Sequence, residues 1–185
     1  VFNAGEIIGV GATTLTNILI HLERIYCNSI GIEYMYIRTP ERIQWIQEKL
    51  NHNSNSPDFS KDQKKQILKK TIEAVAFEKF LHTKYVGQKR FSLEGGEALI
   101  PALDALIEKA ANDGVREFIV GMSHRGRLNT LTNIFGKPVE DIFNEFDGKD
   151  YEEKAFDGDV KYHLGWTSNR QTDSGLKVFM NIAPN

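Results

Sequence analysis

Apolar residues recur at three- and four-residue steps in several stretches of this chain, and each such stretch predicts an amphipathic helix. The first begins at Thr13 or Thr14, either of which can act as the N-cap, and ends near Asn28. The second begins at Pro40, a residue suited to the first helical position, and continues to Leu50. The N-terminal part of the chain is therefore expected to be mainly helical.

Two further helices are predicted after a polar interruption. Lys61–Lys84 is long, with a cationic first half and an apolar second half. Acidic residues flank its lysines, which is typical of a solvated helix face. Glu97–Ala111 follows Gly95 and Gly96, which allow a tight turn before the helix begins.

Shorter apolar runs have the composition of β-strands. They are Gly31–Arg38, Phe91–Leu93 and Phe118–Met122, and another strand-like run precedes the end of the chain. If the second and third runs are parallel, the helix between them completes a βαβ unit. The predicted fold class is α/β, with a helical N-terminal region followed by βαβ units.

The polar run Asn51–Pro57 is expected to be a loop or linker that buries nothing. It divides the chain into a helical arm with its linker, residues 1–56, and the beginning of an α/β domain, residues 57–185. Both chain ends are abrupt, so we expect the sequence to be part of a longer protein.

Composition and charge exclude several classes of partner. The 185 residues carry a net charge of −2 and the pI is near 6.2, so no overall basic field supports nucleic-acid binding. Tyr34, Tyr36 and Trp45 are interpreted as core residues rather than base-stacking platforms, because aromatics at strand and helix spacing usually pack. The single cysteine, Cys27, excludes an internal disulfide, and neither a secretory signal nor an apolar run of about 18 residues occurs. We expect an intracellular protein that binds neither nucleic acid nor membrane.

A cationic segment directly follows the Phe118–Met122 run. His124, Arg125 and Arg127 would lie at the carboxyl end of a strand, where open α/β sheets bind ligands and where an anion is easily held. A second histidine, His163, lies in another predicted loop. Imidazole N–H groups together with a guanidinium are suited to a dicarboxylate.

Structural roles compete with this interpretation. His124 can cap a helix, and Arg125 can belong to an internal ion pair. A metal site is less favoured, because no His-x-x-x-His spacing and no cysteine cluster accompany the histidines. The Gly95–Gly96 loop is interpreted as structural, since Glu94 and Glu97 would repel a phosphate there.

Several motifs occur together in a recognisable order. They are Phe91-Ser-Leu-Glu-Gly95, Met122-Ser-His-Arg-Gly-Arg-Leu-Asn129, Phe143-Asn-Glu-Phe146 and Gly158-Asp-Val-Lys-Tyr-His163. With them the chain, from about Thr14 onward, resembles the thiamine-diphosphate-dependent first component of the 2-oxoglutarate dehydrogenase complex. The resemblance implies the beginning of a thiamine-diphosphate-binding-type fold.

The same resemblance implies an activity and its partners. The family decarboxylates 2-oxoglutarate on thiamine diphosphate with Mg²⁺, in the tricarboxylic acid cycle, and passes the succinyl group to a lipoyl domain of dihydrolipoyl succinyltransferase. Its members are homodimers in the bacterial cytoplasm or the mitochondrial matrix. The motifs map catalytic roles onto His124 and His163 and substrate binding onto Arg125, His124 and His163. The histidines would donate hydrogen bonds to the substrate and assist proton movement.

The chain departs from the family in extent. The family's Gly-Asp-Gly/Ala motif, which holds Mg²⁺ and diphosphate, is expected beyond Asn185, so no metal ligand is assigned here. Gly158–Val160 is a decoy, because Tyr151–Lys154 before it is no buried strand. The piece alone is therefore expected to be inactive. The alternative is a stand-alone, non-catalytic binding or regulatory module derived from the family. The related 2-oxoadipate differs from 2-oxoglutarate by one methylene, which changes binding by only about 1–3 kcal/mol, so the sequence does not distinguish the two substrates.

Overall fold

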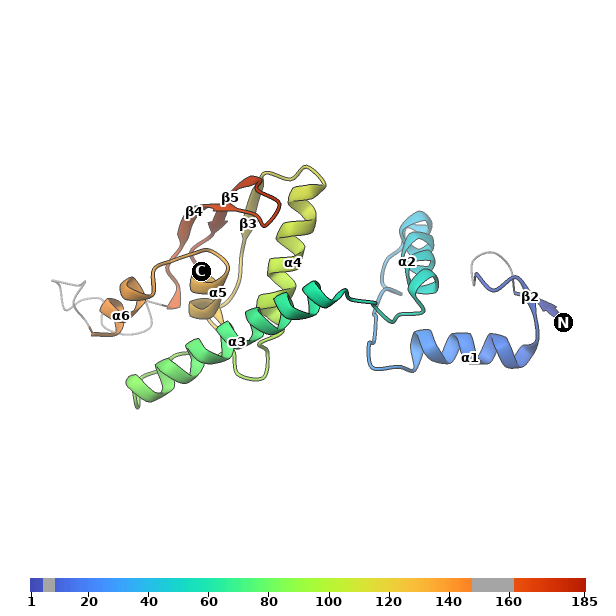
Figure 1. Ribbon diagram of the computed structural model, residues 1–185, viewed down its shortest axis with the longest axis horizontal. Helices are drawn as coiled ribbons and strands as arrows, with labels where there is room; N and C mark the ends of the chain where they lie inside the picture. Colours follow the sequence, from blue (N-terminus) through green and yellow to red (C-terminus); the bar gives the residue numbers. More distant parts are fainter. Residues whose placement is uncertain (5–8, 148–161) are drawn as a thin grey trace. The chain divides into compact units, whose positions relative to one another are not determined.

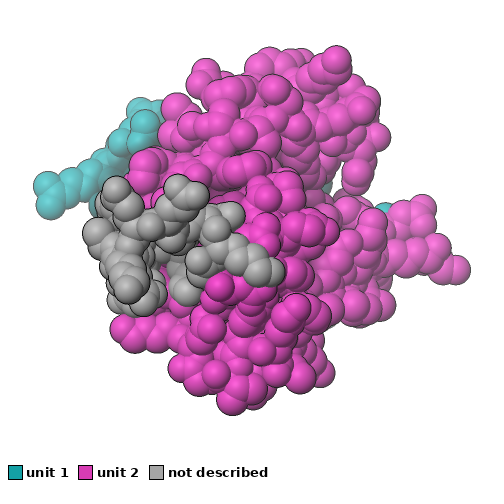
Figure 2. Space-filling view, turned by 90° about the vertical axis from the view of Figure 1, so that its left-hand side faces the viewer, with its two compact units in different colours: residues 1–60 teal, residues 61–185 magenta. Residues whose placement is uncertain are grey.

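The chain divides into two compact units, residues 1–60 and 61–185, which are distinguished in Figure 2. The computed structural model describes residues 1–4, 9–147 and 162–185. No helix within these described ranges is both long enough and apolar enough to cross a membrane. Each unit has its own hydrophobic cluster, and the two are described separately.

Unit 1, residues 1–60, begins with a short hairpin and a helix. Strand β1 (Phe2–Asn3) pairs antiparallel with β2 (Ala12–Thr13), and α1 (Leu15–Tyr26) follows. The helix begins where Thr14 Oγ1 accepts a hydrogen bond from the Asn17 N–H at 3.3 Å. The predicted cap and the predicted end of this helix are confirmed to within two residues.

The second helix of unit 1, α2, spans Pro40–Asn53 and begins with proline, as predicted. The predicted strand at Gly31–Arg38 is wrong, because this segment has no partner strand and forms an irregular connection with a turn. Its Tyr34 is nevertheless buried, and the Tyr34 and Tyr26 hydroxyl groups are hydrogen-bonded at 3.1 Å. That hydrogen bond and burial raise the pKa of Tyr26 to about 12.

The core of unit 1 is small. Ile25, Tyr34 and Leu50 are buried, and three partly buried isoleucines pack against them. The core role predicted for the aromatic residues holds for Tyr34 only, since Tyr36 and Trp45 are 78% and 60% exposed within this unit.

The prediction that the polar run after α2 is a linker that buries nothing is wrong. Asn55 is buried, and its side-chain amide donates to the carbonyl groups of Ile25 at 2.8 Å and Ile30 at 2.7 Å. Its backbone is left-handed, with φ of 49°, a conformation that asparagine tolerates better than most residues. Asn55 therefore fastens the end of α2 onto the end of α1.

Unit 2, residues 61–185, combines helices with a small sheet (Figure 1). Its elements are α3 (Lys61–Lys84), α4 (Leu99–Asn112), β3 (Glu117–Val120), α5 (Arg127–Asn133), α6 (Val139–Asp147), β4 (Trp166–Gln171) and β5 (Lys177–Ile182). The two long helices and the strand after them lie within about two residues of the predicted positions. The helices α4 and α5 both contact α3.

The sheet in unit 2 has the order β3-β5-β4. β3 runs parallel to β5, with Glu117 opposite Phe179, and β4 runs antiparallel to β5 in a hairpin. The helices α5 and α6 lie in the connection between the two parallel strands. This parallel crossover confirms the α/β class.

The strand predicted at Phe91–Leu93 does not form. Phe91 adopts a left-handed φ of 44°, and the Leu93 N–H donates to the Glu78 carboxylate instead of to a neighbouring strand. The parallel partner of β3 is consequently β5 and not the 91–93 segment. The Glu78 side chain therefore accepts the Leu93 N–H hydrogen bond that the predicted strand would have donated within a sheet.

Burial of Asn55 leads to a prediction for unit 1. The Asn55→Ala variant removes the hydrogen bonds to the carbonyl groups of Ile25 and Ile30 and should lower the local free energy of unfolding by about 1–3 kcal/mol. Amide hydrogen exchange of α1 and α2 in the whole chain measures this change. Ser56→Ala, at the exposed neighbouring position, is the control. Equal exchange in the two variants would contradict the role assigned to Asn55.

Candidate functional site

Three segments of unit 2 meet at the amino end of α5. The 122–126 loop leads from β3 into α5, the 91–93 turn precedes α4, and the 162–165 segment precedes β4. The Gly126 N–H donates to the Phe91 carbonyl at 2.9 Å, which joins the loop to the turn. The Phe91 ring lies 4.1 Å from the ring of His124 and meets the buried Tyr162 ring edge-on at 4.9 Å.

The two histidines predicted for the site lie side by side. The ring centroids of His124 and His163 are 5.9 Å apart, and the rings are inclined at 74°. Both side chains are half-buried. Among the described residues neither imidazole has a hydrogen-bond partner, and an imidazole nitrogen can donate to or accept from a ligand.

Arg125 lies at the exposed rim of the same loop. Its Nη1 donates to the Ser92 carbonyl at 3.1 Å, which holds the side chain against the 91–93 turn. Within the described residues no carboxylate pairs with it. A guanidinium has five N–H donors, so most of its capacity is left for an anion.

Arg127 does not lie at the rim, and its predicted place beside Arg125 in an anion site is wrong. Its side chain is fully buried and donates to the carbonyl groups of Met122 at 2.9 Å and Leu164 at 2.8 and 3.0 Å, and also to Ala183. Arg125 precedes α5, whereas Arg127 is the first residue of this helix and is enclosed by the segments that it bonds. Burial lowers the pKa of the Arg127 guanidinium from its usual value.

The hydrogen bonds of Arg127 join the segments that carry the histidines. Leu164 directly follows His163, and the Arg127 N–H donates to the His124 carbonyl at 3.1 Å. The end of β5 is held by the same side chain through Ala183. One buried cation therefore sets the separation of the two imidazoles.

Gly126 is required by the close approach of the loop and the turn. Its φ is 74°, and a Cβ atom at this position would lie 2.6 Å from Leu93 Cδ1. Leu93 is itself buried, so it has little space into which to move. The glycine in the His-Arg-Gly-Arg sequence thus allows the 122–126 loop to contact the 91–93 turn.

Sequence reasoning missed the supporting residues of the site. Glu78 accepts hydrogen bonds from the 91–93 turn, and Asn129 on α5 donates to the same carboxylate at 3.0 Å. One feature of the sequence could have indicated this role: Glu78 lies between Phe77 and Leu81, in the apolar half of a predicted helix. A carboxylate placed among core positions must find partners there.

The donors gathered here suit an anion. Among the described residues no group of three or more histidine, cysteine, aspartate or glutamate side chains is arranged to hold a metal. The decoy at Gly158–Val160 and the Tyr151–Lys154 run lie outside the described residues. Two imidazoles and a guanidinium offer N–H groups, which hydrogen-bond carboxylate and carbonyl oxygens.

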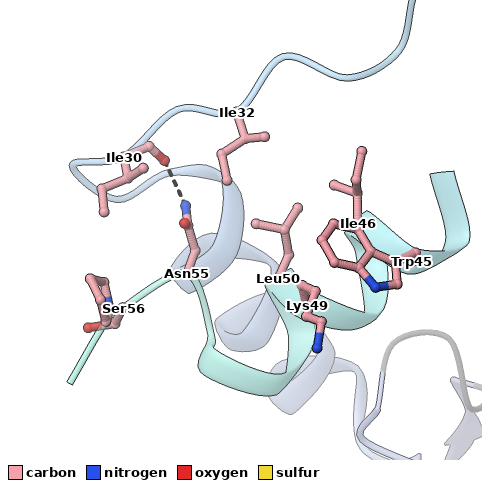
Figure 3. Close-up of a pocket in the computed structure, with 9 residues that line it drawn as sticks. Ile30, Ile32, Trp45, Ile46, Lys49, Leu50, Asn55 and Ser56 are labelled. Carbon is pink, nitrogen blue, oxygen red and sulfur yellow. Dashed lines mark hydrogen bonds between the residues drawn. The ribbon is translucent and has the colours of Figure 1, made fainter. Parts of the chain in front are cut away.

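Unit 1 contains a separate pocket, shown in Figure 3. It has a volume of about 360 Å³ and is lined mainly by apolar side chains, including Ile32, Trp45 and Ile46, with Lys49 at its edge. The Lys49 ammonium lies 5.6 Å from the centre of the Trp45 ring. No histidine lines this pocket, so the chemistry expected from the sequence lies in unit 2.

Comparison with known proteins gives a consistent result. The family model described as Dehydrogenase E1 component matches residues 69–175. The 2-oxoglutarate dehydrogenase E1 component of Cupriavidus necator is 46% identical over 186 residues, covering 100% of this chain and 19% of the relative. Those of Brucella anthropi and Brucella canis are 45% and 44% identical, each covering 97% of this chain and 18% of the relative. The chain spans about a fifth of the length of these curated relatives.

The contrast between the two arginines leads to a stability prediction. Arg127→Lys replaces a planar donor fork with an ammonium group that cannot reach all three carbonyls, and each carbonyl left unpaired should cost about 1–3 kcal/mol. Arg125→Lys should change the free energy of unfolding by less than about 0.5 kcal/mol, because that side chain is exposed. Chemical denaturation of the two variants measures the difference. Equal free energies of unfolding in the two variants would show that the hydrogen bonds of Arg127 do not hold these segments together.

Proposed function

The chain belongs to the dehydrogenase E1 component family, and from this premise we propose that it forms the substrate-binding side of a 2-oxoglutarate dehydrogenase E1 component. The proposal rests most directly on the adjacent imidazoles of His124 and His163, beside the exposed guanidinium of Arg125. The names of the relatives supply the reaction class. The activity proposed for the full-length protein is oxidative decarboxylation of 2-oxoglutarate with transfer of the succinyl group.

The substrate has two carboxylates and a keto oxygen, and the site offers donors for such groups. Arg125 would grip one carboxylate through two parallel N–H donors, which fixes orientation as well as charge. His124 and His163 would donate to the keto oxygen or the second carboxylate, and an imidazole can also act as a general acid or base. The proposed roles are therefore substrate binding for Arg125 and both binding and proton transfer for the histidines.

Packing around the histidines supports this assignment. The Phe91 ring packs on the His124 ring, and the Tyr162 ring packs on Phe91, so water has limited access to one side of the His124 ring. Hydrogen bonds to a developing negative charge are stronger where water is excluded. Arg125, by contrast, is exposed where a charged substrate would arrive.

Thiamine diphosphate, when bound by the complete enzyme, would supply the electron sink for the decarboxylation. The sequence contains no Gly-Asp-Gly/Ala motif, and on this ground we assign the Mg²⁺ and diphosphate ligands to other parts of the full-length protein. The proposed partners are 2-oxoglutarate, the lipoyl domain of dihydrolipoyl succinyltransferase and a second E1 subunit. The proposed location is the bacterial cytoplasm.

Substitution of Arg125 tests the site in the full-length enzyme. Arg125→Lys keeps the charge but loses the two-point grip, so kcat/KM for 2-oxoglutarate should fall about tenfold to a hundredfold, the equivalent of one charge-assisted hydrogen bond. Steady-state decarboxylation kinetics and a thermal melt are measured on the same purified variant. Arg24→Lys, at an exposed position in α1, is the matched control. A lowered melting temperature with unchanged kcat and KM would remove Arg125 from the site.

The isolated 185-residue chain gives a second test. It should bind no thiamine diphosphate in the micromolar range, with or without Mg²⁺, because its sequence lacks the Gly-Asp-Gly/Ala motif that would hold the metal and the diphosphate. Titration calorimetry measures this, with the full-length protein as the positive control. Tight, Mg²⁺-dependent binding to the isolated chain would contradict the assignment of the cofactor ligands to other parts of the protein.

A further inference from the structure

Glu78 is a buried carboxylate in the second half of α3. Its side chain is surrounded by core positions, and the residue is only 8% exposed. A carboxylate removed from water to this extent is retained only when hydrogen bonds or charges compensate it. The identity of its partners therefore indicates what the residue holds in place.

Among the described residues, the partners of Glu78 come from two segments that flank the candidate site. Oε2 accepts from the Ser92 hydroxyl at 2.7 Å, and Oε1 accepts from the Leu93 N–H at 3.1 Å. Oε1 also accepts from Asn129 Nδ2 at 3.0 Å, and Arg90 Nε lies 3.8 Å from Oε2. Both oxygens thus connect α3 to the 91–93 turn, and one also connects it to α5.

The 91–93 turn depends on such contacts. Phe91 has a φ of 44°, which a bulky side chain rarely adopts and which persists only where surrounding contacts hold it. The two residues that follow Phe91 are the ones bonded to Glu78. Loss of the carboxylate would release the turn toward more common backbone conformations.

The same turn is bonded to the loop that carries the proposed catalytic and binding residues. The Phe91 carbonyl accepts from the Gly126 N–H, and the Ser92 carbonyl accepts from Arg125 Nη1. The Phe91 ring packs at 4.1 Å on the ring of His124. A continuous set of contacts therefore leads from Glu78 through the turn to His124 and Arg125.

We propose that Glu78 is a positioning residue for the 2-oxo acid site. Its carboxylate holds the 91–93 turn against α3. The turn, held in this position, orients the Arg125 guanidinium and the His124 ring. Glu78 does not touch the substrate and takes no proton in the reaction. The kinetic consequence rests on the proposed function, whereas the structural consequence can be measured without it.

Amide hydrogen exchange of the full-length protein tests the structural step. In Glu78→Ala, peptides covering Phe91–Gly96 and Ser123–Gly126 should exchange about tenfold faster or more than in the unmodified protein. Glu73→Ala is the control, because Glu73 lies on the same helix and its ion pairs among the described residues are with Lys69 and Lys70 of that helix. Exchange in these two peptides that matches the control would overturn the proposal.

A second variant covers the case in which Glu78→Ala does not fold. Glu78→Gln keeps the shape but cannot accept at both side-chain positions, and its neutral hydrogen bonds are weaker than those of a carboxylate. The same two peptides should exchange faster in this variant, by a smaller factor. Unchanged exchange in a folded Glu78→Gln protein would also overturn the proposal.

A double-substitution cycle tests the kinetic step and separates positioning from general stability. Glu78→Ala should lower kcat/KM for 2-oxoglutarate about tenfold in the unmodified enzyme but about threefold or less when Arg125→Ala is already present, because the two residues act through one set of contacts. Equal factors in both backgrounds would show that Glu78 does not act through Arg125. An unmodified enzyme that fails to decarboxylate 2-oxoglutarate would reject the proposed function alone, and the exchange measurements would still decide the role of Glu78.

Discussion

The guanidinium of Arg127 is a buried cation whose described partners are all backbone carbonyls. Such an arrangement is stable only when every donor is used, because a buried charge without hydrogen bonds is costly. The three carbonyls belong to the end of β3, the segment before β4 and the end of β5. The positions of these three segments, and of the histidines on two of them, therefore depend on one side chain. A carboxylate partner would have satisfied the charge at a single point, whereas carbonyls on separate segments distribute the constraint over the site.

A second group of polar contacts in unit 2 joins α4 to β4. Asp104 on α4 is buried, and Arg170 on β4 donates to it at 2.6 Å and to Glu108 at 2.9 Å. This pairing fastens α4 to the hairpin in the way that Glu78 fastens α3 to the 91–93 turn. The apolar core fills the space between these polar joints. Hydrophobic burial supplies the driving force for packing, and the directional contacts select one arrangement of the segments.

Much of the helical structure could be predicted from periodicity and caps, as with Thr14, Pro40 and the full extent of α3. The α/β class also followed from the pattern, whereas the expectation that His124 and His163 share one site came from their residue types and from the family resemblance. The conformation of the 91–93 segment could not be predicted, because it depends on hydrogen bonds to Glu78, which lies on another element. Likewise Arg125 and Arg127 have the same chemistry and nearly adjacent positions, and only tertiary packing places one at the rim and the other inside. Local sequence describes what a segment can do alone, and these residues act through long-range contacts.

The reach of the Arg127 side chain also affects the order in which the protein can assemble during synthesis. The carbonyl of Ala183 lies 56 positions further along the chain, so it is made well after Arg127 has left the ribosome. Until then the guanidinium lacks one of its acceptors and favours hydration over burial. The helices α3 and α4 involve closer contacts and can pack first, whereas the parallel β3–β5 pairing closes a long loop. The nascent chain should therefore hold its helices early and complete the histidine pair last, when β5 emerges.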